Sequence, residues 1–205
     1  MPKHLILDMG NVLLNYDPEY ALSRFCRSGE ERDTIRRELF QGPDWIRGDM
    51  GLITNEQRYD SVSRRIPAAF HPALRACVEG WDGCMVPLPG VLDFLTRQKA
   101  LGRRLYVLSN ACDRFHSYFP RAIDTALFDG ILVSSDVHAV KPDPAIYRIF
   151  LEKYPVDPAD SLFVDDRADN VAGAEAAGIP GYRFDGDYER LTDYLCELDR
   201  QEGNI

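Results

Sequence analysis

Five short apolar runs, each bounded by polar or turn-forming residues, are spaced along the chain. Runs of this length that are apolar throughout are typical of strands buried on both faces of a sheet. Segments with the periodicity of helices lie between the later runs, so strands and helices alternate. This pattern predicts a parallel β-sheet flanked by helices, an α/β fold. The predicted strands are residues 4–8, 104–109, 130–134, 161–165 and 181–184.

Turn and capping residues mark the ends of the predicted core helices. Leu88-Pro89-Gly90 leads into one helix, which Gly102 ends. Asp143-Pro144 supplies an N-cap and a first-turn proline for a second helix, because an aspartate side chain accepts from free backbone N–H groups at a helix start. A third helix follows Asp165-Asp166 and is expected to end at Gly178, since glycine commonly follows the last helical turn.

Residues 17–85 break the alternation, because every pattern in this segment is helical. Asp17-Pro18 opens one helix, and residues 54–57 form a capping box that opens another. A helical insert directly after the first strand should fold as a lid over the carboxyl edge of the sheet. We therefore expect a core domain of residues 1–16 and 86–205 and a helical cap domain of residues 17–85, with hinges near Asn15-Tyr16 and Val86-Pro87.

Acidic residues end two of the predicted strands. Asp8 follows the first apolar run, and Asp165-Asp166 follows the fourth. Because parallel strands bring their carboxyl ends to one edge of a sheet, these three acids should meet and could hold a hard divalent cation such as Mg²⁺. An acid placed like Asp8 is costly unless it is used, whereas the pair alone could equally cap a helix. Asp169 and Asn170, a few residues on, are expected to be helix caps, and a supporting role beside the acids is the alternative.

Composition and charge narrow the class of protein. The 205 residues suffice for one domain with an insertion, and 45% hydrophobic and 28% charged residues are ordinary for a globular protein. A net charge of −9 with no basic run argues against a nucleic-acid or membrane partner.

No apolar stretch has the length of a membrane span, and the first strand begins too early for a signal peptide. Five irregularly spaced cysteines indicate reduced thiols, so we expect a cytoplasmic protein. The oligomeric state is not predicted.

Four motifs, in order over nearly the whole chain, resemble those of the haloacid dehalogenase-like (HAD) superfamily of aspartate-nucleophile hydrolases. Each motif is weak alone, and the set is specific because each falls at the expected strand or loop. The helical insert resembles the cap of the branch whose cap follows the first motif. Within that branch, the chain resembles bacterial α-glucose-1-phosphate phosphatases in the first motif, in Arg47-Gly48-Asp49 and in the segment from Ser109 to His116. The four motifs are Asp8-x-Gly10-Asn11-Val12, Ser109-Asn110, Lys141-Pro142, and Asp165-Asp166 with Asn170 following.

The resemblance implies a Rossmann-like core and a phosphatase that uses Mg²⁺. Asp8 would attack phosphorus, and Lys141 would keep Asp8 ionised and bind phosphate oxygens. A metal is needed because a phosphate and a carboxylate 4 Å apart repel by about 4 kcal/mol at the effective dielectric of a protein surface. The implied metal ligands are Asp8, the Gly10 carbonyl, Asp165 and Asp166, and either acid of the pair could bind the metal directly. The implied phosphate or substrate contacts are Gly10, Asn11, Ser109, Asn110 and His116.

Gly10 departs from the family pattern. Most members have an aspartate there, which protonates the leaving oxygen and later activates water, and general acid catalysis of this kind contributes about 10²–10⁴-fold. One explanation is an anomeric phosphate, whose leaving group needs little help. Another is an acid from elsewhere, with Asp17 and His116 as candidates, although an N-cap and a surface histidine are the better explanations of these two. Arg47 and Asp49 are candidates to face the substrate from the insert, whereas Trp45 is better explained as part of its core.

The function predicted from these residues is hydrolysis of a small phosphorylated metabolite through an aspartyl-phosphate on Asp8. A sugar phosphate, an anomeric ester among the candidates, is the expected substrate. The alternative from another class is a phosphate-binding or regulatory protein that has lost catalysis, which Gly10 alone favours. A haloacid dehalogenase would share Asp8 but has no use for a metal or for Asp165-Asp166, and a phosphomutase depends on the acid that Gly10 lacks.

Overall fold

The computed structural model describes residues 2–202 and contains one sheet of five parallel strands. The strand order is β3-β2-β1-β4-β5, so the first strand of the chain lies in the middle. This confirms the predicted α/β fold, and each strand falls within a residue of its predicted limits. The strands are β1 (His4–Leu7), β2 (Arg104–Ser109), β3 (Gly130–Val133), β4 (Ser161–Asp165) and β5 (Gly181–Arg183).

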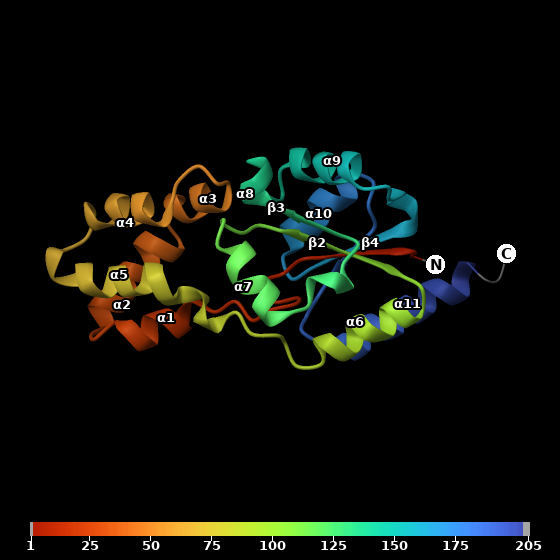
Figure 1. Ribbon diagram of the computed structural model, residues 1–205, viewed down its shortest axis with the longest axis horizontal. Helices are drawn as coiled ribbons and strands as arrows, with labels where there is room; N and C mark the ends of the chain where they lie inside the picture. The colour runs from red at the N-terminus through yellow and green to blue at the C-terminus, as the bar shows by residue number, and fades with distance from the viewer. Residues whose placement is uncertain (1, 203–205) are drawn as a thin grey trace.

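Helices cover both faces of the sheet, as Figure 1 shows. Alternate residues of each strand point to opposite faces, so Leu5 and Leu7 of β1 join one hydrophobic core and Ile6 joins another. The first core is completed by α6 (Val91–Ala100), α7 (Phe115–Ala122) and α11 (Tyr188–Glu202), and the second by α9 (Pro144–Lys153) and α10 (Ala168–Ala176). The shorter elements of this part are η4 (Thr125–Leu127), α8 (Ser134–Val137) and η5 (Pro158–Asp160).

The predicted helix caps are present. The Asp143 side chain accepts from the backbone N–H of Ala145 at 2.8 Å, with Pro144 in the first turn of α9. Gly102 and Gly178 follow α6 and α10 with φ angles of +82° and +84°, a region that favours glycine. Local capping chemistry therefore sets these helix ends as the sequence predicts.

Residues between β1 and α6 form only helices, which lie beyond one end of the sheet (Figure 1). We call residues 18–84 the helical insert. Two connecting segments join it to the sheet side by side, because the Asn15 N–H donates to the Val86 carbonyl at 2.8 Å and the Leu88 N–H donates to the Leu13 carbonyl at 3.0 Å. Its elements are α1 (Pro18–Phe25), α2 (Gly29–Ile35), η1 (Arg36–Phe40), α3 (Pro43–Asp49), α4 (Asn55–Ser63), η2 (Ala68–Phe70), α5 (His71–Gly80) and η3 (Trp81–Cys84).

The insert has its own polar and aromatic core. The Arg58 side chain is buried, with its guanidinium 4.6 Å from the centre of the Trp45 ring. Trp45 also packs against Trp81, with ring centres 5.1 Å apart. The capping box of residues 54–57 that precedes Arg58 has both of its hydrogen bonds, as predicted. Trp45 therefore contributes to packing within the insert.

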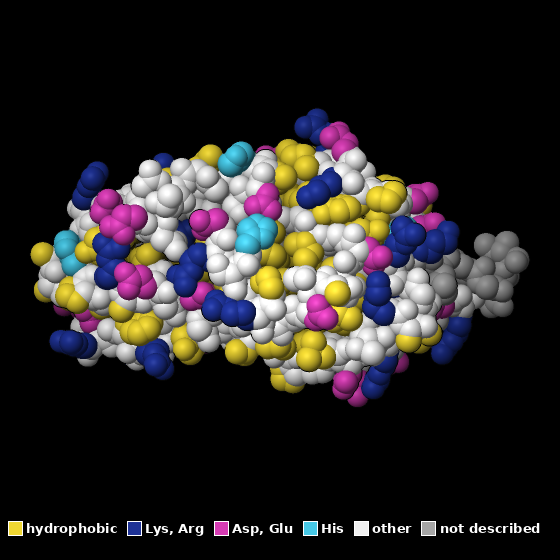
Figure 2. Space-filling view, viewed as in Figure 1, with side chains coloured by type: hydrophobic (Ala, Val, Ile, Leu, Met, Phe, Trp, Pro, Cys, Tyr) yellow, Lys and Arg dark blue, Asp and Glu magenta, His cyan; other side chains and the backbone are white. Residues whose placement is uncertain are grey.

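On the face shown in Figure 2, basic and acidic side chains are interspersed rather than gathered by sign. All five cysteines are free thiols, four of them buried. Among residues 2–202, no helix is both long enough and apolar enough to cross a bilayer.

Candidate active site

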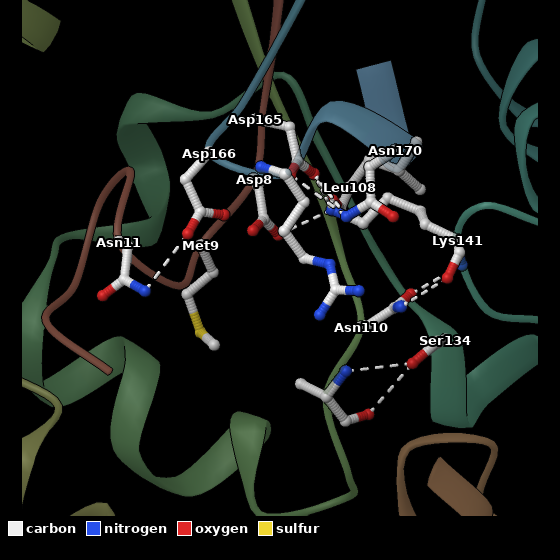
Figure 3. A network of polar contacts seen from close by, with 12 residues as sticks. Asp8, Met9, Asn11, Leu108, Asn110, Ser134, Lys141, Asp165, Asp166 and Asn170 are labelled. Atoms are coloured by element: carbon white, nitrogen blue, oxygen red, sulfur yellow. Dashed lines mark hydrogen bonds and ion pairs between the residues drawn. The ribbon is translucent and has the colours of Figure 1, made fainter. Parts of the chain in front are cut away.

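Three carboxylates converge at the carboxyl edge of the sheet. Asp8 directly follows β1, and its N–H donates to the Val164 carbonyl of β4 at 2.9 Å. Asp165 ends β4, and Asp166 is the next residue. One oxygen from each of the three side chains lies within 4.8 Å of the others, and Figure 3 shows the side chains turned toward one another. Parallel pairing of β1 with β4 thus brings together acids that are far apart in the sequence.

Lys141 holds two of these carboxylates together. Its Nζ donates to Asp8 Oδ1, to Asp165 Oδ2 and to the Leu108 carbonyl, each at 2.7 Å. These three bonds use all the hydrogens of an ammonium group. The Lys141 side chain is completely buried, so its position is fixed by these partners.

Asn110 fixes the backbone of Lys141. The Lys141 N–H donates to Asn110 Oδ1 at 2.8 Å, and Asn110 Nδ2 donates to the Lys141 carbonyl at 2.9 Å. The sequence predicted a phosphate contact for Asn110, and the structure shows its amide paired with Lys141 instead (Figure 3). In this arrangement Asn110 positions the lysine.

The two acids of the pair have different surroundings. Asp165 is fully buried, and its oxygens accept from the Arg167 N–H at 2.9 Å and from Asn170 Nδ2 at 3.0 Å, in addition to Lys141. Asp166 is half-buried and accepts from Asn11 Nδ2 at 3.2 Å. Asp166 therefore keeps more of its lone pairs for a ligand. Asn170 orients Asp165, which is the supporting role that the sequence offered as the alternative to a helix cap.

The cluster carries more negative than positive charge. Burial raises the pKa of Asp8, and the charge of Asp165 adds to this, although the Lys141 ammonium opposes it. The two carboxylates in turn outweigh the effect of burial on Lys141 and raise its pKa. Burial also raises the pKa of Asp166. Three carboxylates beside one ammonium form an oxygen-rich site with a formal charge of −2, which fits a divalent cation such as Mg²⁺.

Ser109 and Asn11 complete the immediate surroundings. Ser109 Oγ is buried and has no hydrogen-bond partner among the described residues, so its hydroxyl is free to bind an incoming oxygen. Asn11 has a φ of +55°, and its Oδ1 accepts from the Tyr16 N–H at 3.1 Å. This contact and the bond to Asp166 tie the loop after β1 to the second acid of the pair.

The two candidates for a substitute acid lie elsewhere. Asp17 is exposed and caps α1, accepting from the Glu19 N–H at 2.9 Å. His116 is 55% exposed, and its Nε2 lies 3.0 Å from Asp136 on the surface. Each residue has a local partner that accounts for it, and neither has a described hydrogen bond to Asp8, Lys141 or the acid pair.

Ser134 is a contact that the sequence did not reveal. Its Oγ, seen in Figure 3, accepts from the Ala111 N–H at 2.9 Å. The same hydroxyl donates to the Asp49 carbonyl at 2.5 Å. It therefore links the loop after β2 to the end of α3 in the insert. Serine at the end of a strand carries no local signal for such a contact, because its partners are distant in the sequence.

Comparison with known proteins gives relatives over most of the chain. A family model for haloacid dehalogenase-like hydrolases matches residues 2–178. Sesquiterpene phosphatase astK of Aspergillus oryzae is 28% identical over 195 residues, covering 95% of this chain and 92% of that protein. A phosphoglycolate phosphatase of Nitrosospira multiformis is 33% identical over 188 residues, covering 86% and 80%. Drimenol cyclase drtB of Aspergillus calidoustus is 28% identical over 187 residues, and the chain spans 34% of its length.

Solved structures share the same fold. A HAD family enzyme of Bacteroides thetaiotaomicron, solved as a mutant in complex with magnesium and inorganic phosphate, superposes with a TM-score of 0.73 at 22% identity, covering 93% of this chain and 99% of that one. Likeness at this identity concerns the fold. Because the family model covers most of the sequence, the chain belongs to the haloacid dehalogenase-like hydrolase family.

Proposed function

We propose that the protein is a phosphomonoesterase that hydrolyses a small phosphorylated metabolite through an aspartyl-phosphate on Asp8. The observation that carries this proposal is the contact of Lys141 Nζ with both Asp8 and Asp165, at 2.7 Å each, beside Asp166. A buried lysine between two acids keeps a carboxylate available as a nucleophile and offers positive charge to a phosphate. The relatives that are phosphatases support the same reaction class.

The reaction would proceed in two displacements. An Asp8 oxygen attacks phosphorus, forming a new O–P bond as the bond from phosphorus to the leaving oxygen breaks, and the leaving oxygen takes a proton. Water then attacks the phosphorus and loses a proton, and the bond to Asp8 breaks to release inorganic phosphate and restore the carboxylate. The Ser109 hydroxyl would bind a phosphate oxygen in both steps, and the positive charge of Lys141, whose hydrogens are held by protein oxygens, would attract the phosphate without a direct hydrogen bond.

Asp8, Asp166 and the Gly10 carbonyl would hold Mg²⁺ directly, with Asp165 positioning Lys141 beside them. The metal, when bound, supplies positive charge that offsets the repulsion between carboxylate and phosphate. We assign the direct contact to Asp166 because both oxygens of Asp165 already accept hydrogen bonds within the protein.

The two acids should therefore respond differently to substitution. Asp166→Asn is expected to raise the Mg²⁺ concentration that gives half-maximal activity by at least about 10-fold, with little change in thermal unfolding. Asp165→Asn is expected to lower the unfolding temperature, because it disturbs the bonds to Lys141, Arg167 and Asn170. Activity against Mg²⁺ concentration and thermal unfolding, measured on both variants, test the assignment. Equal loss of metal affinity with unchanged stability in Asp165→Asn would contradict it.

We propose that residues 17–85 are a cap domain that selects the leaving group and that the substrate is a sugar phosphate. Support for the cap comes from the position of the helical insert beyond the carboxyl edge of the sheet and its two adjacent connecting segments (Figure 1). Support for a sugar phosphate comes from the resemblance in the first motif and in Arg47-Gly48-Asp49. The relatives act, by their names, on chemically different esters, so the substrate has to be found by experiment.

Phosphate release from a panel of metabolite phosphates, with Mg²⁺ and with EDTA, tests the proposed function. The panel should contain anomeric and primary-alcohol sugar phosphates. We expect release from sugar phosphates that requires Mg²⁺ and stops with EDTA. Release that is unaffected by EDTA would contradict the metal assignment, and no release from any ester would contradict the phosphatase itself.

A further inference from the structure

The Asp49 carboxylate, at the end of α3, is a polar group that the site described above does not use. Among residues 2–202 it has no hydrogen bond or ion pair, although most other acids of the insert are paired with arginines. Asp49 is half-buried, and this loss of contact with water raises the pKa of Asp49 to about 7, against the opposing charge of Arg58 on α4. An unpaired carboxyl in such surroundings needs an explanation, because leaving it there costs stability.

Backbone contacts hold Asp49 against the active site. Ser134 Oγ joins the Asp49 carbonyl to the Ala111 N–H, two residues after Ser109. The following turn is docked as well, because His138 Nδ1 lies 2.8 Å from the Met50 carbonyl. The insert thus meets the core at the loop that carries Ser109 and Asn110.

Gly51 allows the backbone of the insert to approach the backbone of the core closely. Its φ is +67°, and a Cβ on Gly51 would lie 2.5 Å from the Ser135 carbonyl oxygen. Only a glycine allows both this backbone conformation and this approach. The position of Asp49 is therefore set by a specific backbone fit between insert and core.

Aromatic packing connects the end of α3 to Gly10. Asp49 lies one helical turn after Trp45, on the same side of α3. The Trp45 ring packs against Tyr16, with ring centres 6.2 Å apart, and a Cβ on Gly10 would lie 3.6 Å from the Tyr16 Cβ. Burial raises the pKa of Tyr16, and the charge of Asp49 adds to this effect. Asp49 therefore belongs to the cluster around Gly10, in the loop that also carries Asp8.

Nothing in the backbone or the packing requires glycine at position 10. The 3.6 Å contact with Tyr16 is an ordinary van der Waals distance, and the φ of Gly10 is not in the left-handed region. A side chain would fit there, so what position 10 lacks is a proton donor. Asp49 provides an unpaired carboxyl in the same cluster.

We propose that Asp49 is the general acid and base of the reaction: it gives a proton to the leaving oxygen in the first displacement and takes one from the attacking water in the second. This inference rests on the proposed phosphomonoesterase function. Proton transfers balance over one turnover, since the proton given to the alcohol is replaced by the proton taken from water. The acid then comes from the insert and the nucleophile from the sheet, so catalysis requires the two to be docked.

The environment of Asp49 suits both roles. A carboxyl with a pKa near 7 is partly protonated at neutral pH and can both donate and accept. Arg58 is the charged group that acts on it, and the titratable groups around it are Tyr16, Tyr118 and Cys112. On α8, which packs against α3, Asp136 is engaged with His116 at the surface.

Two synthetic substrates of similar shape test the inference. Benzyl phosphate releases an alkoxide that must be protonated, whereas p-nitrophenyl phosphate releases a stable anion, and neither leaving group carries a hydroxyl that Asp49 could recognise. The second displacement is the same for both esters, so kcat/KM, which reports the steps up to release of the leaving group, measures the acid role alone. For Asp49→Asn we expect kcat/KM on benzyl phosphate to fall about 10²–10⁴-fold and by at least about 100-fold more than on p-nitrophenyl phosphate. In the wild type, kcat/KM on benzyl phosphate should fall as the pH rises through the pKa of Asp49, and this fall should be absent in the variant.

Placing an acid at position 10 provides the matched control. In the Asp49→Asn background, Gly10→Asp is expected to raise kcat/KM on benzyl phosphate by at least about 10-fold. Equal losses of kcat/KM on the two substrates, an unchanged kcat/KM on benzyl phosphate, or no gain from Gly10→Asp would each overturn the role of Asp49. Failure of the wild type to hydrolyse either ester would instead overturn the proposed phosphatase function, so the two failures are distinguishable.

Discussion

Asp8→Asn is expected to abolish phosphate release, by on the order of 10⁴-fold or more, while leaving the protein folded. The amide oxygen of asparagine can still accept from Lys141, but the side chain can no longer form the ester bond to phosphorus. Phosphate release in saturating Mg²⁺ measures the loss. Thermal unfolding should show no decrease in stability, because the raised pKa of Asp8 means that its ionised form costs stability at neutral pH.

Binding of inorganic phosphate to the same variant separates an enzyme from a binding protein. Removing the charge of Asp8 lowers its repulsion of the phosphate. We therefore expect the affinity for inorganic phosphate, measured by calorimetry with Mg²⁺ present, to be kept or increased. A wild type and an Asp8→Asn variant that bind phosphate equally, neither releasing it from any ester, would favour the regulatory alternative. Residual turnover in Asp8→Asn within about 10-fold of the wild type would show that another group is the nucleophile.

The sheet could be predicted because its strands are buried on both faces. In β4, for example, the three central residues Leu162, Phe163 and Val164 are all fully buried, so no polar position interrupts the apolar run. The helix ends could be predicted for a similar reason, since a cap such as Asp143 acts on residues a few positions away. The docking of α3 on α8 could not, because Ser134 and Gly51 meet their partners only in the folded chain.

The convergence of Asp8 with the acid pair could be predicted from the topology of a parallel sheet. The partners of individual atoms could not. Asn110 follows a strand at the edge of the site, which suggested a phosphate contact, but its amide has the shape to pair with the Lys141 backbone and does so. Asn170 has the composition of a helix cap, yet it lies within reach of Asp165 once α10 is packed under β4.

Asp49 was a candidate from the sequence only as a residue that faces the substrate. Its lack of a partner is a property of the fold, because neighbouring acids in the insert have arginines placed to meet them, as Asp44 does with Arg65 at 2.9 Å. Local explanations also account for Asp17 and His116, which the sequence put forward as acids. The absence of an acidic side chain at Gly10 can be read from the sequence. The residue that replaces it cannot, because this depends on which side chains of the insert have no partner near the sheet in the folded protein.

Lys141→Met is expected to destabilise the fold by about 3–5 kcal/mol and to remove activity even where the protein remains folded. Without the ammonium, Asp8 and Asp165 are buried carboxylates that lie within hydrogen-bond distance of one vacated position and repel each other. The pKa of Asp8, which burial already raises, should rise further. An acid whose pKa is higher in the folded than in the unfolded state stabilises the fold as pH falls, so the variant should recover stability on acidification. Urea unfolding of wild type and variant across a series of pH values measures this.

A double-mutant cycle with Asp165→Asn shows whether charge balance is the reason. If Lys141 is needed to neutralise the acids, Asp165→Asn should destabilise the wild type but recover part of the stability of Lys141→Met, because it removes one of two repelling charges. Additive losses would instead mean that Lys141 and Asp165 stabilise the fold independently. A Lys141→Met variant that unfolds at the wild-type urea concentration at every pH would contradict the ion-pair account. Recovery of folding without recovery of activity would separate the two roles of the lysine, as a counter-charge in the folded site and as the positive charge that attracts phosphate.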